Sequence, residues 1–450
     1  MASAVEQFAS NLNFGSFAKA QELKQRLWFT LLAIIIYRVG THIPLPGIDP
    51  VIWNSIFTDK MGGVLDMFNM FSGGALERMS ILALNIMPYI SASIIMQLMT
   101  SMNPTLAAMK KDGEQGRKRI NQYTRYGTVL LAAVQAYGLA VGLENMAAGG
   151  GASAVINPGL FFRITTIITV VGGTIFLMWL GEQITARGVG NGISLIIFAG
   201  IVAGLPKSLA FMMELGREGT LSIAMIMGVI VMIGSVIGFI VFVERASRRV
   251  VVQYPKRMVG GNRMAGGQSS HMPLKINVSG VIPPIFASSL LLMPVTIAGF
   301  SSVDTGVGWL DSVSRYLQHG QPLYMFLYGA LIIFFAFFYT AIVFNPDETA
   351  DNLRKQGGFI PGIRPGKATA DYLDRILTRI TVIGAAYLTL VCLLPEYIVA
   401  HNNLPFYLGG TSLLIAVTVP MDTIAQIQSH LLAHQYEGLI KKSKLRGSRK

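Results

Sequence analysis

Cysteine and charge are both scarce in this chain of 450 residues. Its one cysteine, Cys392, lies in an apolar run, so neither a disulfide nor a thiolate metal site can form within one chain. Asp, Glu, Lys and Arg make up 13% of the residues, against about 25% in soluble domains, whereas hydrophobic residues make up 52%. The composition therefore excludes an ordinary soluble globular protein and indicates a membrane protein.

The residues needed for catalysis or ion coupling are also missing from the apolar segments. Coupled transporters and proton pumps keep ionisable residues in mid-membrane, and an intramembrane protease needs a nucleophile with a base, or an aspartate pair. Here the acidic residues fall near the ends of apolar segments or in loops, and no phosphate-binding glycine loop occurs. A passive conduit is the leading class, and an ion-coupled secondary transporter of a small solute is the alternative.

The positive charges that are present gather in a few short polar stretches. Of the 36 Lys and Arg residues, 29 lie in six stretches, at residues 19–26, 110–125, 187, 245–275, 354–379 and 441–450. Because short cytoplasmic loops are enriched in Lys and Arg, this bias predicts that all six are cytoplasmic, with the N and C termini inside. Charges dispersed over such loops suit anionic lipids and acidic partners better than nucleic acid. The first 24 residues lack the apolar core of a cleavable signal, so the first span should remain as an anchor.

The apolar segments between these stretches predict ten membrane-spanning helices. They cover Leu27–Ile43, Met79–Thr100, Tyr126–Met146, Leu160–Leu180, Ile193–Leu209, Leu221–Val243, Val278–Phe300, Leu323–Phe344, Ile376–Ile398 and Leu404–Ile427. Pro88, the Pro283–Pro284 pair and several glycines interrupt them, and such breaks indicate an internal cavity, with kinked packing helices as the plainer alternative. Two inverted halves of five follow, at residues 1–210 and 211–450, with a hinge at residues 204–219.

A short glycine-bracketed segment lies between the first two spans. Residues 62–75, GGVLDMFNMFSGGA, are apolar but far too few to cross a bilayer. The segment could lie at the membrane surface as an amphipathic helix. It could instead fold back into a cavity on its glycine hinges and move.

Several long strings, in order, resemble the SecY family, the central subunits of the bacterial protein-conducting channel. The resemblance runs from about Lys19 to Lys444. It rests on MFNMFSGGALERMSILALNIMPYISASI (67–94), WLGEQITARGVGNGISLIIFAGIVAGLP (179–206), HMPLKINVSGVIPPIFASS (271–289), VFNPDETADNLRKQGGFIPGIRPG (343–366) and FYLGGTSLLI (406–415). It implies an all-α channel with ten transmembrane helices in two inverted halves.

In that family a ring of aliphatic side chains closes the waist of an hourglass channel. The resemblance assigns the ring to Ile86, Ile90, Ile193, Ile197, Ile285 and Ile415. Residues four apart lie on one face of a helix, so we expect the first two to stack, and likewise the next two. Branched apolar side chains offer no hydrogen bonds to water or ions, and a narrow ring of them is therefore a dewetted seal.

The glycine-bracketed segment, residues 62–76, corresponds to the family's plug, which rests under the ring and swings out. Its residues are Gly62, Gly63, Leu65, Met67, Phe68, Asn69, Met70, Phe71, Gly73 and Gly74. We expect the glycines to supply the hinges. The resemblance also implies a lateral gate, where the second and third spans meet the seventh and eighth, through which apolar segments pass into lipid.

Two loops, residues 244–275 and 345–375, resemble the docking sites for the motor ATPase SecA and the ribosome. In the first, residues 244–249 are expected to continue the sixth span and residues 250–263 to form a hairpin that carries Arg257 and Arg263. In the second, Arg364 lies in the turn PGIRPG, which suits contact with carboxylates or RNA phosphate, although a solvated loop charge is the plainer reading.

The chain departs from the family at three places. Asn262 stands where a basic residue is common, Asn85 where a glycine is common, and Pro420 adds a break to the last span. We expect a non-enzymatic subunit of the bacterial cytoplasmic (inner) membrane, with no cofactor. The partners implied are SecE, SecG, SecA, the translating ribosome, and unfolded secretory and membrane-protein chains.

Overall fold

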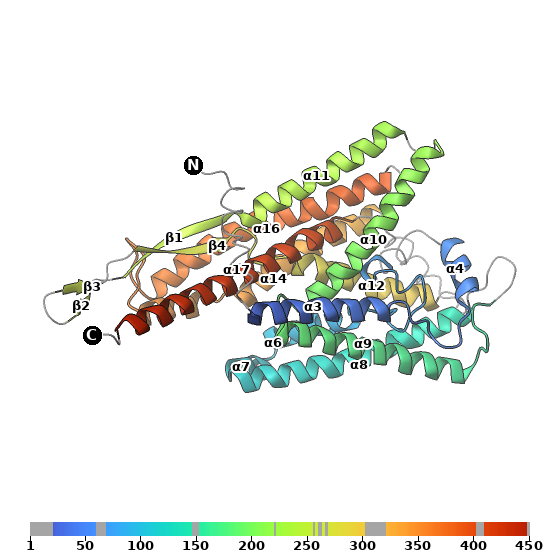
Figure 1. Ribbon diagram of the computed structural model, residues 1–450, viewed down its shortest axis with the longest axis horizontal. Helices are drawn as coiled ribbons and strands as arrows, with labels where there is room; N and C mark the ends of the chain where they lie inside the picture. The colour runs from blue at the N-terminus through green and yellow to red at the C-terminus, as the bar shows by residue number, and fades with distance from the viewer. Residues whose placement is uncertain are drawn as a thin grey trace. The chain divides into compact units, whose positions relative to one another are not determined.

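A computed structural model describes residues 21–59, 69–145, 153–219, 222–254, 257–259, 263–265, 269–301, 321–401 and 409–447 of the chain (Figure 1). Its helices are α3 Gln21–Gly40, α4 Pro50–Asp59, α6 Met87–Met102, α7 Pro104–Lys111, α8 Glu114–Asn145, α9 Leu160–Arg187, α10 Gly192–Arg217, α11 Ile223–Arg245, α12 Ile282–Ser301, α14 Pro322–Val343, α15 Pro346–Lys355, α16 Lys367–His401 and α17 Gly410–Gly447. Its strands are β1 Ser247–Gln253, β2 Arg257–Val259, β3 Arg263–Ala265 and β4 Ser269–Lys275. Over these residues the predicted helical class is confirmed.

Within the described part of the chain, seven helices are long and apolar enough to cross a membrane: α8, α9, α10, α11, α14, α16 and α17. They correspond to the third to sixth and the eighth to tenth predicted spans. The other three predicted spans are also helical. However, α3 begins with a polar turn, and α6 has only 16 residues. In α12 the apolar stretch with described side chains, Ile282–Leu291, is shorter than a membrane span.

The second predicted span begins later than expected. A helix was predicted from Met79, but α6 begins at Met87, and residues 81–86 form turns. Both Met79 and Asn85 have positive φ, at 44° and 49°, which a right-handed helix cannot accommodate. Pro88 therefore lies in the first helical turn, where its missing N–H has no intrahelical partner to lose, and it does not interrupt the helix.

Two other predicted breaks are continuous helix. Residues 204–217, proposed as a hinge, belong to α10, which runs through Pro206. Likewise α17 continues through Pro420. A proline removes one backbone donor, and a long helix packed against neighbours can retain its course despite that loss.

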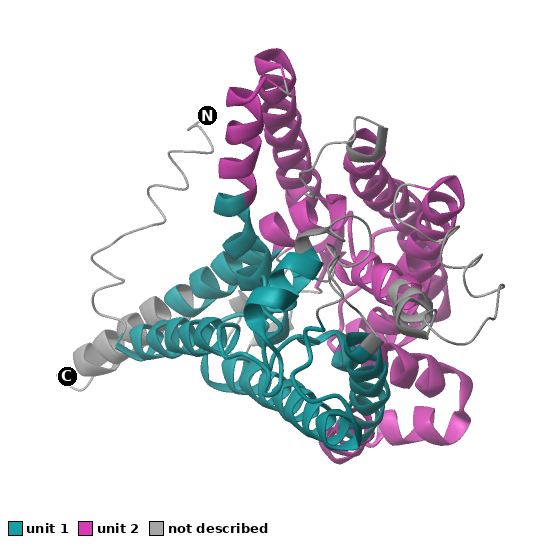
Figure 2. Ribbon diagram, turned by 90° about the vertical axis from the view of Figure 1, so that its right-hand side faces the viewer, with its two compact units in different colours: residues 1–89, 125–207, 419–450 teal, residues 90–124, 208–418 magenta. Residues whose placement is uncertain are grey.

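The chain forms two compact units (Figure 2). The first comprises Met1–Tyr89, Arg125–Lys207 and Val419–Lys450, and the second comprises Ile90–Thr124 and Ser208–Thr418. In the first unit α3 packs against α9. The loop before α10 is tied on both sides, because the Val189 N–H donates to Thr30 Oγ1 at 3.1 Å and the Gly190 N–H to Gln426 Oε1 at 2.9 Å.

In the second unit α14 packs against both α12 and α16, and α15 packs against α16. The loop between α11 and α12 is a long two-stranded ladder, β1 with β4, that carries the short ladder β2 with β3. The prediction that residues 244–249 continue the preceding helix is wrong beyond Arg245. The run of valines at 250–252 is β-branched and favours a strand, and the hairpin is longer than predicted.

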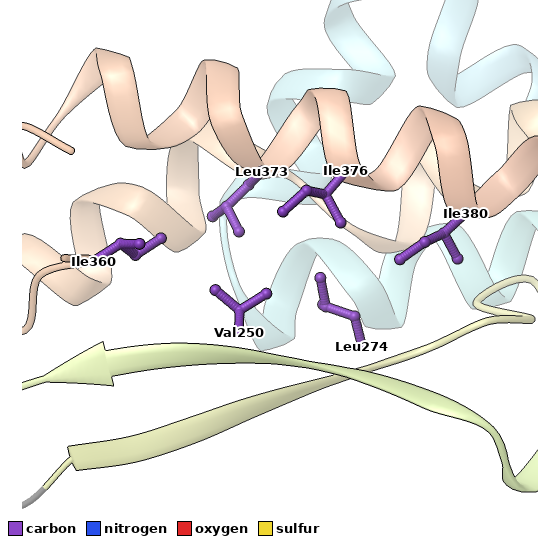
Figure 3. Packing of buried hydrophobic residues seen from close by; sticks show 6 residues of the cluster. All are labelled: Val250, Leu274, Ile360, Leu373, Ile376 and Ile380. Atoms are coloured by element: carbon purple, nitrogen blue, oxygen red, sulfur yellow. The ribbon is translucent and has the colours of Figure 1, made fainter. Parts of the chain in front are cut away.

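An aliphatic cluster anchors this hairpin to the second unit (Figure 3). Val250 and Leu274 project from β1 and β4 towards Leu373, Ile376 and Ile380 of α16. Each is at most 5% exposed. Burying such a side chain stabilises a fold by about 1.5–3 kcal/mol, so the hairpin has a fixed root.

Candidate functional site

Residues 69–86, which begin inside the predicted plug, are largely buried and consist mostly of turns after a helical end at residues 69–71. We call residues 69–86 the turn segment. Most of its side chains are buried, with Phe71, Ala75 and Leu82 each at most 4% exposed. The described part of the predicted plug is thus packed inside protein. Non-helical backbone is tolerated at membrane depth only where protein satisfies its polar groups.

Local hydrogen bonds satisfy much of this backbone. The Gly74 N–H donates to the Asn69 carbonyl at 2.9 Å, and the Ser80 N–H to that of Ala75 at 2.8 Å. The strand-like stretch after α3 adds two more, from Leu45 N–H to the Met79 carbonyl and from the Ile81 N–H to the Ile43 carbonyl. These hydrogen bonds stabilise the segment in this conformation.

Two of its glycines adopt a backbone conformation that other residues rarely take. Gly73 has φ +66° and Gly74 has φ +81°. Gly73 also lies against α10, where a Cβ atom would come within 2.9 Å of Gly200 Cα. Gly200 shows the reciprocal contact, since its own Cβ would lie 2.9 Å from the Phe71 carbonyl oxygen. Only glycine at both positions allows the two backbones to approach so closely.

Three consecutive carbonyls of the segment each accept a hydrogen bond from a different side chain. The Asn85 amide donates to the carbonyl of Phe71, and the Tyr37 hydroxyl donates to that of Ser72 at 3.2 Å. The Arg38 guanidinium donates to that of Gly73 at 2.8 Å. Further along, the Trp53 indole of α4 donates to the carbonyl of Leu76 at 3.0 Å.

The backbone conformation at Asn85 explains one of the three departures from the family. Its φ of +49° is the left-handed conformation, which glycine adopts freely and which asparagine tolerates better than most residues. Asparagine fits the position where glycine is common, and its amide adds a tie to Phe71 that a glycine could not supply.

The residue directly after the predicted plug forms an ion pair with α10. Glu77 pairs with Lys207, and Asn69 holds the same glutamate twice. Its Oδ1 accepts from the Glu77 N–H at 2.9 Å, and its Nδ2 donates to Glu77 Oε2 at 3.3 Å. Burial alone would raise the pKa of Glu77, but Lys207, Asn69 and the nearby Arg78 outweigh it and lower the pKa.

The predicted ring residues lie in several elements. Ile86, Ile90, Ile197 and Ile415 are buried, whereas Ile193 and Ile285 are half-buried. Ile193 and Ile197 are one turn apart on α10 as predicted. Ile86 is the residue directly before α6, because left-handed Asn85 delays the helix start, and its stacking with Ile90 stays a prediction. The ring itself stays a prediction.

The remaining predicted residues divide by position. Asn69, Met70, Phe71, Gly73 and Gly74 belong to the turn segment, whereas Gly62, Gly63, Leu65, Met67 and Phe68 lie outside the described residues, as does Asn262. Arg257 and Arg263 begin β2 and β3. Arg364 is exposed between Gly362 and Gly366, whose φ values are +82° and +108°. Thr369 Oγ1 donates to the Arg364 carbonyl at 2.9 Å and fixes this turn.

Sequence reasoning did not predict that six side chains hold the turn segment: Tyr37, Arg38, Trp53, Glu77, Asn85 and Lys207. A signal was available for two of them. Arg38 and Lys207 are among the seven basic residues outside the six basic stretches. A basic residue in or beside an apolar span is costly, and it therefore needs a partner inside the protein.

Comparisons with known proteins agree on one family. The SecY family model matches residues 80–424. The protein translocase subunit SecY of Escherichia coli strain K12 is 56% identical over 426 residues, which cover 95% of this chain and 96% of that protein.

Two solved structures share the fold at 19% identity, and each covers 90% of this chain and 92% of its own. One, described as the structure of a protein conducting channel, has a TM-score of 0.65. The other has a TM-score of 0.59, and its description states that the plug domain of the SecY protein stabilises the closed state of the translocation channel and maintains a membrane seal.

Proposed function

Because this chain belongs to the SecY family, we propose that it is the pore-forming subunit of a protein translocation channel. It passes unfolded secretory polypeptides across the membrane and releases transmembrane segments sideways into lipid. It is a channel subunit and not an enzyme. The relatives give no support to the alternative of an ion-coupled transporter, since the 56% identical E. coli protein is a translocase subunit.

The channel is closed at its waist by the ring of Ile86, Ile90, Ile193, Ile197, Ile285 and Ile415. Support comes from their chemistry, as six branched apolar side chains offer no hydrogen bonds to hydrated ions. The same side chains make no sequence-specific contacts, so they can part around a polypeptide of any composition.

Residues 62–76 are the plug that seals the channel at rest. The observation that carries this proposal is the buried turn segment, whose carbonyls are held by side chains from several elements. Polar ties of this kind each stabilise by about 0.5–1.5 kcal/mol, or about 1.5–3 kcal/mol where the donor is charged. Together, hydrogen bonds of this strength can hold the segment in place. Each one alone is weak enough to break, so they can be released one after another.

The finer topology follows the positive-inside bias. Ten spans in two inverted halves of five, at residues 1–210 and 211–450, place both termini in the cytoplasm of a bacterial cell, with the subunit in its inner membrane. The lateral gate lies where the second and third spans meet the seventh and eighth. An apolar signal segment can leave there for lipid while its backbone stays covered.

The partners are the small membrane subunits SecE and SecG, the motor SecA and the translating ribosome, with anionic lipids at the basic loops. The exposed Arg364 and the hairpin with Arg257 and Arg263 are the docking points. A guanidinium on a fixed turn suits bidentate contact with a carboxylate or a phosphate.

Reconstitution tests the function directly. Vesicles that hold this chain with SecE are given SecA, ATP and a secretory precursor, and the precursor should become protected from added protease. Vesicles without ATP, and vesicles without the chain, are the controls. Protection that is equal in all three would refute a translocation channel.

Crosslinking tests the ring separately. A photoreactive group at Ile86 or Ile285 should crosslink to an arrested secretory chain, whereas one at Phe161 of α9, which is 84% exposed, should not. The transporter alternative holds instead if no crosslink forms and the chain transports a small solute with a saturable flux that depends on an ion gradient.

A further inference from the structure

Glu77 and Lys207 form the longest-range ion pair among the described residues of the turn segment, since they lie 130 positions apart in the chain. The Glu77 side chain is 20% exposed and that of Lys207 is 68% exposed. Asn69 orients the carboxylate, because its Nδ2 donates to Oε2 while Oε1 faces Lys207. The glutamate therefore sits at a fixed place between its own segment and α10.

The pair continues a contact that begins with glycines. Gly200 and Lys207 are seven residues apart on α10, two helical turns, and so lie on one face of that helix. Gly73 meets Gly200 and Glu77 meets Lys207, so residues 73–77 run along this face. One end of the contact depends on close backbone packing, and the other depends on charge.

We propose that Glu77 and Lys207 are positioning residues that latch the plug against α10 in the resting channel, with Asn69 holding the carboxylate in place. The inference rests on the proposal that residues 62–76 are the plug. The latch adds a charge-dependent contact at the point where the plug rejoins the channel wall. Opening of the channel would break this contact.

The latch is a weak contact, because one of its two partners, Lys207, is exposed to solvent. Surface ion pairs stabilise by about 0.2–1 kcal/mol because solvent screens them. Arg78 is the other positive group that acts on Glu77, and it remains in place when Lys207 is neutralised. Loss of the latch should therefore raise the fraction of time that the resting channel is open by about 1.4- to fivefold.

A double-mutant cycle in planar bilayers measures this effect. The full complex with SecE and SecG is incorporated as wild type, Glu77→Gln, Lys207→Gln and the double variant, and the open fraction is recorded without precursor. Glu22→Gln is the matched control, since Glu22 pairs with Arg26 within α3, away from the turn segment. Each 77 or 207 variant should open about 1.4- to fivefold more often, the double variant no more than either single one, and the control as rarely as wild type.

Ionic strength supplies a second measurement, made on the wild type with Glu77→Gln as the reference. Added salt should raise the open fraction of the wild type towards that of Glu77→Gln and leave Glu77→Gln itself unchanged. Effects that add in the double variant, an unchanged open fraction in both single variants, or a wild type that ignores salt would each overturn the latch.

Translocation by the same preparations separates the two proposals. If wild-type complex protects no precursor, the channel function fails whatever the latch does. If the wild type protects precursor while the cycle is additive, only the latch fails.

Discussion

Alanine at position 73 should open the resting channel far more than alanine at the adjacent position 74. Both glycines have left-handed φ, +66° and +81°, so each alanine meets the same kind of backbone cost. Their surroundings differ. A Cβ on Gly73 would lie 2.9 Å from Gly200 Cα, whereas a Cβ on Gly74 would meet first the Arg78 guanidinium at 3.4 Å, which is an ordinary contact with the end of a flexible side chain.

A backbone cost and a packing cost set the size of the difference between the two variants. An L-residue in the left-handed region costs about 1–2 kcal/mol, and this applies to both variants. Forcing a methyl group into a packed backbone contact costs about 1–3 kcal/mol more, and this applies only to Gly73→Ala. Since about 1.4 kcal/mol is tenfold in an equilibrium, Gly73→Ala should shift the plug away from its docked state about five- to a hundredfold further than Gly74→Ala.

The assay is the open fraction of the resting complex in planar bilayers, with vesicle translocation as the check that each variant is assembled. Gly200→Ala tests the contact from the other side, because its Cβ would lie 2.9 Å from the Phe71 carbonyl oxygen without any left-handed strain. Gly204→Ala, one turn further along α10 with nothing within 4 Å, is the neutral control. Equal leak from the 73 and 74 variants, or leak from Gly204→Ala as large as that from Gly200→Ala, would refute the packing argument.

Three further outcomes are expected from the turn segment and the second loop. Asn85→Ala should raise the open fraction more than Asn85→Gly, because alanine keeps the left-handed strain of about 1–2 kcal/mol while both lose the tie to Phe71; the reverse order in the bilayer assay would contradict this. The pKa of Glu77 is lowered in the docked state, so the charge on Glu77 stabilises docking fully at a pH above the ordinary carboxyl pKa. This stabilisation is lost as the pH falls through the lowered pKa. The wild-type open fraction should therefore rise below about pH 4, and that of Glu77→Gln should stay flat. Arg364→Glu should reduce SecA-dependent precursor protection without any change in resting leak, since Arg364 is exposed on a turn that the Thr369 hydroxyl fixes by donating to the Arg364 carbonyl; equal loss with Lys355→Glu, on the neighbouring helix, would show a general charge effect instead.

Much of the architecture could be predicted from the chain alone. The seven long apolar helices were all expected, because a hydrocarbon core demands about 20 apolar residues and the composition shows them without ambiguity. The family could be identified from its strings of residues, and so could the candidate ring and plug positions. Boundaries were less secure. The start of α6 moved from Met79 to Met87, since two non-glycine residues with positive φ carry no distinct mark in a hydropathy pattern.

The contacts that hold the turn segment could not be derived in this way. Tyr37, Trp53 and Lys207 lie far along the chain from the carbonyls or carboxylate that they bind, and apolar periodicity says nothing about which polar groups meet. The same holds for Gly200, whose reason for being glycine is the backbone of Gly73 on another element.

Hydropathy and charge bias alone determined that this protein spans a membrane as a bundle of helices, because transfer free energy depends on composition along a stretch and not on its neighbours. The folded chain decided where helix gives way to turn between Phe71 and Met87, and which side chains hold that turn. Those choices depend on hydrogen bonds and close approaches between distant residues, which exist only once the helices have packed.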